Sequence, residues 1–410
     1  MKEIEGGITA PCGFKASGVH CGIKRNSPDL ALIFSKFEAI AAGMFTINKV
    51  KAAPVVISQK KLRRGKARAI VANSGNANAC TGKKGFENAN RMCKVAAREL
   101  GIDPQEVLVA STGVIGEQLP IEKIEEGIKA AAKNLSSQGS LNAAQAIITT
   151  DKKIKQIAVE TEIPGQGKKK VKIGAIAKGS GMIAPNLATM LCFITTDACI
   201  TLDALKEALR IAVDKSFNQI SVDGDMSTND TVIALANGKA GNKTIKTWKR
   251  KPTLRIKDEN FDIFCKNLEC VCTYLAKEIV RDGEGATKIF EVKVEGAPFP
   301  KDARRIARKI ATSNLVKTAL AGASPNWGRI MAALGSAHTK VKPEKVDIII
   351  EDIQVVKNGE AAGAPLSELR KRLLKNEISI VVKLNQGNCN STFWGCDLTE
   401  KYVKINKRYL

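Results

Sequence analysis

Apolar and polar positions alternate along the chain in two different periods, and the two kinds of segment follow one another from end to end. Short apolar, β-branched runs are typical of buried strands. They lie at residues 30–34, 67–73, 107–112, 171–177, 346–350 and 378–385. Segments in which apolar residues recur every three or four positions are typical of helices. They lie at residues 87–100, 121–135, 202–217, 260–280 and 302–322. This alternation predicts an α/β protein.

Local signals add detail to this pattern. The stretch LATMLCFITTDACI at residues 187–200 is apolar and β-branched, which is typical of a strand entering a core. Thr201 is placed to cap the following helix, with Asp203 in its first turn. The sequence TEIPGQGKKK at residues 161–170 predicts the connection of a hairpin.

Composition is that of an ordinary globular protein, with 410 residues of which 44% are apolar. No window approaches the roughly 18 uninterrupted apolar residues that a membrane helix needs. The first residues, MKEIEGGITAPCGF, lack the apolar core of a secretory signal. We therefore expect a cytoplasmic protein that has no membrane partner.

The net charge of +24 raises the question of nucleic-acid binding. The basic runs at residues 60–64, 168–170 and 246–251 are far apart along the chain, and no RNA-recognition, zinc-finger or helix-turn-helix motif accompanies them. An anionic small substrate explains the charge as well, so we expect no nucleic-acid partner.

The number and spacing of the cysteines and histidines argue against several kinds of catalytic site. The eleven cysteines do not have zinc-ribbon or zinc-finger spacing, so we expect reduced, mostly buried thiols and no metal. A Ser–His–Asp or Cys–His site needs a histidine, and His20 and His338 do not lie near a nucleophile motif. No Walker loop and no strand-borne dinucleotide fingerprint is present.

Five clusters of small, hydroxyl and amide residues are candidates for a ligand site. They lie at residues 73–82, 111–116, 178–182, 223–230 and 281–288. One such cluster is most simply a tight turn. Five in one chain favour loops whose backbone N–H groups and short side chains converge on a ligand.

A threonine hydroxyl can act without a histidine if the free α-amine of the same residue activates it. An internal threonine must first be exposed by cleavage of the bond before it. Thr189 follows Ala188, a small residue that would crowd an attack of Thr189 Oγ on its carbonyl very little. The alternative is that Thr189 is an ordinary buried strand residue.

The motifs together identify the family that the chain resembles. In family order, they are GGITAPCGFKASG, AGMFTINKVKAAPV, NSGNANACTG, STGVIG, ITTD, AKGSGMIAPNLATML, DGDMSTNDTV, RDGEGATK, PNWGRI and WGCDLTEKYVKIN. They span essentially the whole chain. The sequence resembles the ornithine acetyltransferase family of arginine biosynthesis, also called glutamate N-acetyltransferase.

The resemblance implies a precursor that cleaves itself between Ala188 and Thr189. Fragments 1–188 and 189–410 would stay associated, typically as two of each. It also implies a four-layer α-β-β-α sandwich of the N-terminal-nucleophile kind. The reaction would be a ping-pong acetyl transfer without metal or cofactor. N-acetylornithine would acetylate the threonine, ornithine would leave, and glutamate would take the acetyl group. Some members also use acetyl-CoA as donor.

The resemblance also implies roles for individual residues. Thr189 Oγ would be the nucleophile and its α-amine the general base. Thr112 and Gly113 would form the oxyanion hole, through a hydroxyl and a backbone N–H. The substrate-binding residues would be Thr150, together with Thr149, and Lys178, Thr189, Glu284 and Asn406. Lys178 suits the α-carboxylate of a zwitterionic amino acid and Glu284 suits its side-chain ammonium.

Two positions depart from the family. Members usually end a residue or so later with a Ser or Thr that helps to hold the substrate, whereas this chain ends at Tyr409-Leu410, so we expect that contact to be absent. Ser324 stands where the family often has Asp. Two other functions stay open as alternatives: a self-cleaving aminopeptidase of related fold, although such enzymes typically use Ser, and a basic nucleic-acid-binding protein.

Overall fold

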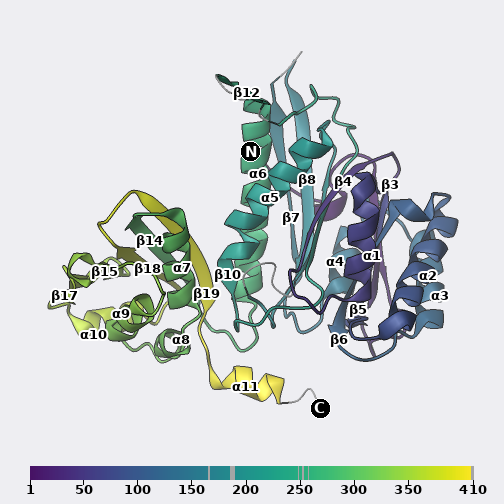
Figure 1. The fold of residues 1–410 in the computed structure, drawn as a ribbon. Helices are drawn as coiled ribbons and strands as arrows, with labels where there is room; N and C mark the ends of the chain where they lie inside the picture. Colours follow the sequence, from purple (N-terminus) through teal and green to yellow (C-terminus); the bar gives the residue numbers. More distant parts are fainter. Residues whose placement is uncertain (165–166, 185–189, 248, 252–253, 257, 408–410) are drawn as a thin grey trace. The chain divides into compact units, whose positions relative to one another are not determined.

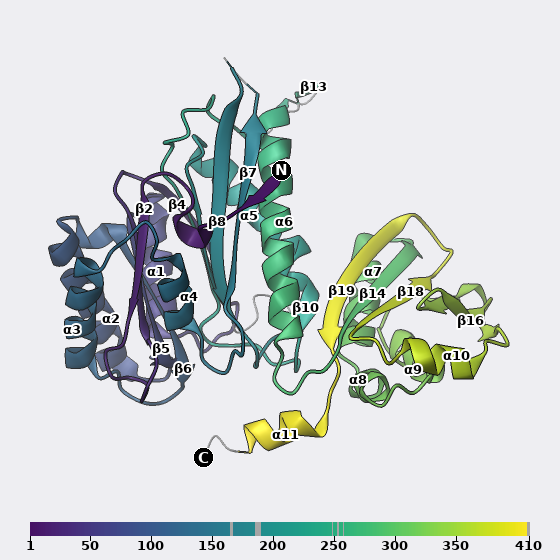
Figure 2. The ribbon, with the colours of Figure 1, turned by 180° about the vertical axis from the view of Figure 1, so that it is seen from behind.

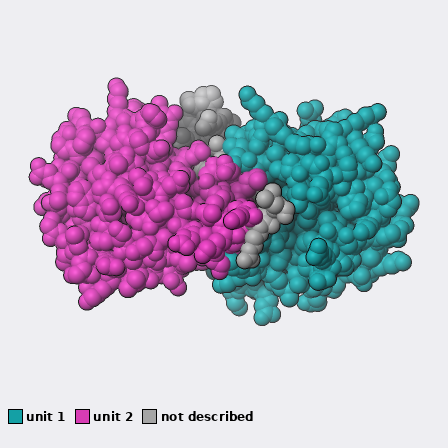
Figure 3. Space-filling model, turned by 90° about the horizontal axis from the view of Figure 1, so that it is seen from below, with its two compact units in different colours: residues 1–179, 186–218, 226–279 teal, residues 180–185, 219–225, 280–410 magenta. Residues whose placement is uncertain are grey.

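The computed structural model describes residues 1–164, 167–184, 190–247, 249–251, 254–256 and 258–407. The chain divides into two compact units, which Figure 3 shows in different colours. Unit 1 comprises Met1–Gly179, Asn186–Asn218 and Met226–Ile279, and unit 2 comprises Ser180–Pro185, Gln219–Asp225 and Val280–Leu410. Among the described residues, no helix combines the length and the apolar character needed to cross a membrane.

The first sheet of unit 1 has six strands in the order β1-β7-β8-β9-β11-β4. Their bounds are β1 (Lys2–Ile4), β4 (Ile40–Phe45), β7 (Lys155–Ile163), β8 (Lys169–Lys178), β9 (Leu191–Thr196) and β11 (Thr231–Ala236). Only β9 and β11 run parallel; the other neighbours are antiparallel. The β7–β8 pair confirms the hairpin predicted around residues 161–170.

The second sheet of unit 1 has the order β2-β3-β5-β6, in which only β5 and β6 run parallel. Its strands are β2 (Phe14–Val19), β3 (Leu30–Ser35), β5 (Ala69–Asn76) and β6 (Val107–Val114). The helices that begin in unit 1 are α1 (Ala53–Lys61), α2 (Gly82–Leu100), α3 (Ile121–Lys133), α4 (Ser140–Ile147), α5 (Leu202–Lys215) and α6 (Glu259–Arg281). The short hairpin strands β12 (Lys249–Lys251) and β13 (Leu254–Ile256) complete it.

One apolar cluster joins the two sheets of unit 1 face to face. Phe193 of β9 and Ile233 of β11 pack with Ile70 of β5 in this cluster. The opposite face of the second sheet packs Val71 of β5 against α2 and α3, for example against Met92. The second sheet is therefore buried on both faces, since successive residues of a strand point to opposite faces.

The helices α5 and α6 form the remaining layer, on the outer face of the six-stranded sheet (Figures 1 and 2). Asn267 of α6 donates a hydrogen bond to Thr161 of β7 over 3.3 Å. Cys192 of β9 and Cys272 of α6 are both fully buried. Unit 1 is therefore an α-β-β-α sandwich, which confirms the predicted α/β class and its four layers.

Unit 2 contains a seven-stranded sheet of order β10-β19-β14-β18-β15-β16-β17. Its strands are β10 (Ile220–Ser221), β14 (Ile289–Ala297), β15 (Asp347–Ile350), β16 (Ile353–Lys357), β17 (Glu360–Ala361), β18 (Glu377–Lys383) and β19 (Cys389–Cys396). Its helices are α7 (Pro300–Ala311), α8 (Asn314–Ala321), α9 (Trp327–Gly335), α10 (Leu366–Arg372) and α11 (Glu400–Asn406). The helix α7 lies along β14 and β19 in Figure 2, where Ile306 joins Phe290 and Phe393 in one core.

Most predicted elements are confirmed, but the single helix predicted at residues 302–322 is wrong. The chain forms α7 and α8 instead, because Ser313 caps the second helix by accepting a hydrogen bond from the N–H of Val316. Thr201 caps α5 as predicted, since its side chain accepts from the N–H of Ala204 over 3.4 Å.

All eleven cysteines lie in the described part of the chain and are free thiols. Five of them are buried, so the expectation that most would be buried is wrong. The strand predicted at residues 187–200 is present as β9 from Leu191 onward. Ala188 and Thr189 lie outside the described residues.

Candidate active site

Thr112 and Gly113 lie at the end of β6, directly beside the motif NSGNANACTG on β5. In the parallel register, Thr112 pairs with Ser74 and Gly113 pairs with Gly75. Gly113 has φ of +136°, and a Cβ there would lie 2.2 Å from the carbonyl carbon of Gly75. A side chain at this position would therefore force the two strands apart. The STGVIG motif needs its first glycine for this close approach.

A network of buried amides holds this strand end in place. Ser111 Oγ donates to Asn73 Oδ1 over 2.6 Å. Asn229, from the loop before β11, donates from Nδ2 to the carbonyl oxygens of Ala77 at 2.6 Å and Ser111 at 2.8 Å. Because these carbonyl groups are buried, each needs such a donor. The motifs at residues 73–82, 111–116 and 223–230 thus form one structure.

Lys178 ends β8 and is 3% exposed. Its Nζ donates to Thr149 Oγ1 over 2.8 Å and to Thr112 Oγ1 over 3.3 Å. Thr150 follows Thr149 and is half-buried. The structure therefore brings the predicted substrate-binding lysine to the predicted oxyanion threonine, and it links both to the ITTD motif.

Asp151, the last residue of that motif, holds the segment in place. Its Oδ1 accepts hydrogen bonds from Lys155 Nζ and from the N–H of Gly179, both at 2.7 Å. Burial disfavours the ionised carboxyl, but the positive charges of Lys178 and Lys155 outweigh it and lower the pKa of Asp151 to about 2. The carboxylate is thus ionised and fixes the start of the loop that follows Lys178.

Met190, the residue that follows Thr189, is held by hydrogen bonds of its backbone. Its N–H donates to Asp230 Oδ1 over 3.0 Å, and its backbone carbonyl accepts from the N–H of Thr231 over 3.1 Å. Asp230 is fully buried. Thr189 itself lies outside the described residues. Met190, which directly precedes β9, is anchored through both its N–H and its carbonyl group.

Glu284 and Asn406, the other two predicted substrate contacts, lie together in unit 2. Asn406 Nδ2 donates to Glu284 Oε2 over 2.9 Å. Asn406 belongs to α11, and the same Nδ2 donates to the carbonyl of Tyr402. A Cβ on Gly181 would lie 2.6 Å from the Glu284 carboxyl carbon, so this glycine leaves room for the acidic side chain.

Hydrogen bonds from the segment that follows β19 fix the loop RDGEGATK within unit 2. Thr399 Oγ1 donates to the carbonyl of Gly285 over 2.7 Å, and Asp397 accepts from Thr287 and Lys288. Burial, together with the negative charges of Asp223 and Glu284, raises the pKa of Tyr402 well above its ordinary value. Tyr402 therefore stays neutral beside the acidic residues.

The contacts of Thr112 decide what its hydroxyl can do. A hydroxyl has one proton and two acceptor lone pairs. Because Lys178 donates to Thr112 Oγ1, the hydroxyl proton points away from Lys178, in a direction in which it could donate to a ligand. Beside it lies the backbone N–H of Gly113. A hydroxyl and an N–H from successive residues, polarised by an ammonium, suit a developing oxyanion.

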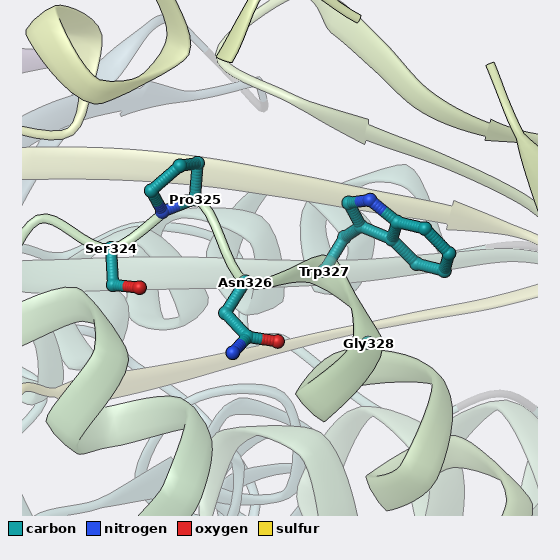
Figure 4. A pocket seen from close by; sticks show the side chains of 5 residues that line it. All are labelled: Ser324, Pro325, Asn326, Trp327 and Gly328. Carbon is teal, nitrogen blue, oxygen red and sulfur yellow. The ribbon is translucent and has the colours of Figure 1, made fainter. Parts of the chain in front are cut away.

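The PNWGRI motif lies apart from these groups in sequence and lines a different pocket. This pocket has a volume of about 320 Å³ and is lined by Ser324, Pro325, Asn326, Trp327 and Gly328 (Figure 4). Asn326 caps α9, and Arg329 Nη1 donates to the carbonyl of Leu315 over 2.9 Å. None of the predicted catalytic or substrate-binding residues that the structure describes lines this pocket.

Three residues that contribute to the site were not singled out from the sequence: Asp151, Asn229 and Asp230. Each lies inside a quoted motif, ITTD or DGDMSTNDTV, so the signal was present. Among the described residues, no group of three or more His, Cys, Asp or Glu side chains is arranged to hold a metal ion.

Comparison with known proteins gives one consistent family. The model of the ArgJ family matches residues 15–410. A protein of Symbiobacterium thermophilum named arginine biosynthesis bifunctional protein ArgJ is 48% identical over the full length of both chains.

Two solved structures match part of the chain. One is an arginine biosynthesis bifunctional protein argJ from Bacillus halodurans, with 42% identity over 53% of this chain and 98% of that chain, and a TM-score of 0.49. The other is an ornithine acetyltransferase from Mycobacterium tuberculosis complexed with ornithine, with 40% identity over 45% of this chain and 97% of that chain, and a TM-score of 0.41.

Proposed function

Because the chain belongs to the ArgJ family, we propose that it transfers the acetyl group of N-acetylornithine to glutamate in arginine biosynthesis. Thr189 carries the acetyl group between two half-reactions, and the products are ornithine and N-acetylglutamate. The observation that supports the proposal is the hydrogen bond that Lys178 Nζ donates to Thr112 Oγ1, next to Gly113 at the end of β6.

Activation requires cleavage between Ala188 and Thr189, which frees the threonine α-amine as a general base. The sheet order supports the expectation that the fragments 1–188 and 189–410 stay together. β9 and β11 come from the second fragment and lie between β8 and β4 of the first. Their backbone hydrogen bonds and shared core resist separation.

The first half-reaction begins with attack of Thr189 Oγ on the acetyl carbonyl of N-acetylornithine. Negative charge develops on the carbonyl oxygen, where the Thr112 hydroxyl and the Gly113 N–H stabilise it. Collapse of the tetrahedral species breaks the bond to the ornithine nitrogen, which takes the proton held by the α-amine. Glutamate then attacks the acetyl ester by the same steps in reverse.

The charges of the predicted substrate-binding residues suit an amino acid. Lys178 suits its α-carboxylate, and Glu284, held by Asn406, suits the side-chain ammonium of ornithine. Thr150 contributes a further polar contact. No metal and no cofactor takes part in these steps.

The assembly and location follow the family. We infer that two copies of each fragment associate, and that the enzyme works in the cytoplasm. Acetyl-CoA is a second donor in some members, and an assay with acetyl-CoA and glutamate tests this chain for that activity.

Denaturing electrophoresis and a transfer assay test the proposal together. We expect two fragments, one with the N-terminal sequence Thr-Met-Leu-Cys, and formation of N-acetylglutamate from N-acetylornithine. Thr189→Ala is expected to give an uncleaved and inactive chain. A wild-type chain that transfers acetyl groups without any break at Thr189 contradicts the mechanism. Peptide hydrolysis, measured alongside, tests the aminopeptidase alternative.

A further inference from the structure

Lys24 is a half-buried lysine whose side chain lies against the strand end that carries the predicted oxyanion residues. Gly75 of β5 pairs with Gly113 of β6. A Cβ on Gly75 would lie 2.8 Å from Ile23 Cγ2 and 3.1 Å from Lys24 Cγ. The methylene stem of Lys24 therefore packs on the glycine that pairs with Gly113.

The ammonium of Lys24 reaches the ITTD motif. Its Nζ donates to the carbonyl of Ile148, the first residue of that motif, over 3.1 Å. Lys178 Nζ donates to Thr149 Oγ1 on the next residue over 2.8 Å. Two lysines from distant parts of unit 1 thus bond to neighbouring residues of one motif.

The two carboxylates near Lys24 already have other partners. Asp29 Oδ2 accepts from the backbone N–H groups of Gly22, Ile23 and Lys24 at 2.8–3.1 Å. Asp151 Oδ1 accepts from Lys155 Nζ and from the N–H of Gly179. Among the described residues, the Lys24 ammonium therefore makes no ion pair.

The charge of Lys24 is unfavourably placed in the chain alone. Burial lowers the pKa of its ammonium, and the positive charge of Lys178 lowers it too, although Asp29 and Asp151 act in the opposite direction. An anion between the two ammonium groups would offset both the burial and the repulsion.

A purely structural role is the alternative. Ile148 directly follows α4, and a cation that bonds to the last carbonyls of a helix stabilises it. That role needs only one of the three donors of the ammonium. The other two have no protein partner among the described residues, and the half-buried side chain leaves them accessible to a ligand.

We propose that Lys24 and Lys178 together bind the α-carboxylate that N-acetylornithine and glutamate share. The inference rests on the proposed function, since it assumes these substrates. It adds Lys24 to the predicted substrate contacts. The two ammonium groups donate to the same carboxylate and fix its position beside Thr112.

The test is steady-state kinetics of Lys24→Met, which keeps the stem but has no charge. We expect KM for N-acetylornithine and KM for glutamate each to rise about 10–100-fold, the usual loss for a hydrogen bond to a charged group. We expect kcat to change little, because the contact is the same in the ground state and the transition state. Unchanged KM values overturn the inference. A rise for glutamate alone also overturns it, because Lys24 would then bind the side-chain carboxylate.

Lys123→Met is the matched control. Lys123 is exposed on α3, and its Nζ donates to the carbonyl of Gly22 over 3.4 Å, in the same loop as Lys24. This variant therefore removes a lysine that bonds to a backbone carbonyl of the loop, but it leaves Lys24 in place. We expect both KM values to stay at the wild-type level.

A substrate without the carboxylate separates binding from a structural role. N-acetylputrescine is N-acetylornithine without its carboxylate. We expect Lys24→Met to lower kcat/KM for N-acetylornithine and to leave kcat/KM for N-acetylputrescine almost unchanged. Equal losses with the two donors would mean that Lys24 only holds the ITTD segment, which overturns the inference.

The wild-type chain decides the question if Lys24→Met does not fold, as judged by circular dichroism. Two ammonium groups on one carboxylate predict that kcat/KM for N-acetylputrescine is at least about 100-fold below that for N-acetylornithine, tenfold or more for each group. A smaller difference overturns the inference.

The two proposals fail in different ways. A wild-type chain that transfers no acetyl group from N-acetylornithine to glutamate contradicts the proposed function. A wild-type chain that transfers it, together with a folded Lys24→Met variant of unchanged KM, contradicts only the role of Lys24.

Discussion

Lys178 Nζ donates a hydrogen bond to Thr112 Oγ1 over 3.3 Å, although the two residues are 66 positions apart in the chain. The ammonium occupies an acceptor lone pair of the hydroxyl, so the hydroxyl proton points away from Lys178. In the proposed reaction Lys178 would have two effects: it would bind the substrate carboxylate, and it would make Thr112 a stronger donor.

Removal of the Thr112 hydroxyl is expected to slow acetyl transfer. Thr112→Val has nearly the same volume but no donor, so we expect kcat to fall about 10²–10³-fold, the usual loss for one oxyanion donor. Thr112→Ser keeps the hydroxyl and is expected to retain most of the activity. Steady-state kinetics with N-acetylornithine and glutamate compare the three proteins. Equal activity in Thr112→Val and Thr112→Ser would exclude the hydroxyl from the oxyanion hole.

Replacement of Asp151 tests the buried ion cluster around Lys178. Asp151→Asn leaves Lys155 without its charged partner in a site where both side chains are at most 1% exposed. Loss of one member of a buried pair costs about 3–5 kcal/mol. Glu162→Gln is the control, because its pair with Lys168 is exposed and contributes about 0–1 kcal/mol. Urea unfolding followed by circular dichroism measures both variants.

The low pKa of Asp151 also predicts how stability depends on pH. The pKa falls from an ordinary 3.8 to about 2 in the folded chain. The carboxylate therefore contributes roughly 2 kcal/mol above the ordinary pKa, and this contribution is lost as pH falls through the folded pKa. We expect Asp151→Asn to lose less stability than wild type between those two values. A wild-type stability that is constant across this acid range would contradict the ionised state.

The elements of the fold were predictable where hydrophobic periodicity is local. It marked β3, β5, β6 and β8, and it marked α2, α3, α5 and α6. The break between α7 and α8 was not predictable from periodicity, because the apolar residues on the two sides of Thr312 and Ser313 continue one helical spacing. Only the cap that Ser313 makes with Val316 reveals the new helix.

The site was predictable as a set of motifs but not as a set of contacts. Asn229 bonds to Ser111 across 118 positions, and Asp230 bonds to Met190 across 40. Such pairings depend on how strands are ordered in the sheets, and strand order leaves no local signal in one sequence. The family resemblance supplied roles for Thr112 and Lys178, whereas the supporting residues became visible only through the structure.

Asn229 is expected to affect the rate through the position of Thr112. Asn229→Ala leaves the buried carbonyls of Ala77 and Ser111 without their donor, at a cost of about 1–3 kcal/mol for each group. We expect kcat to fall while KM for both substrates changes little. Asn237→Ala is the control, because it also removes side-chain hydrogen bonds, among them one to the carbonyl of Cys12, but none of them reaches the strand end that carries Thr112. A rise in KM without a fall in kcat would place Asn229 in substrate binding instead.

Glu284 is expected to distinguish the two substrates, because ornithine has a side-chain ammonium and glutamate does not. Glu284→Gln keeps an acceptor for Asn406 but removes the charge. A hydrogen bond to a charged group contributes about 1.5–3 kcal/mol, so KM for N-acetylornithine should rise about 10–100-fold. KM for glutamate should change much less. Glu291→Gln, on β14 with its carboxylate bonded to Trp394 over 2.7 Å, is the control. Equal effects on both substrates would mean that Glu284 shapes the site without recognising the ammonium.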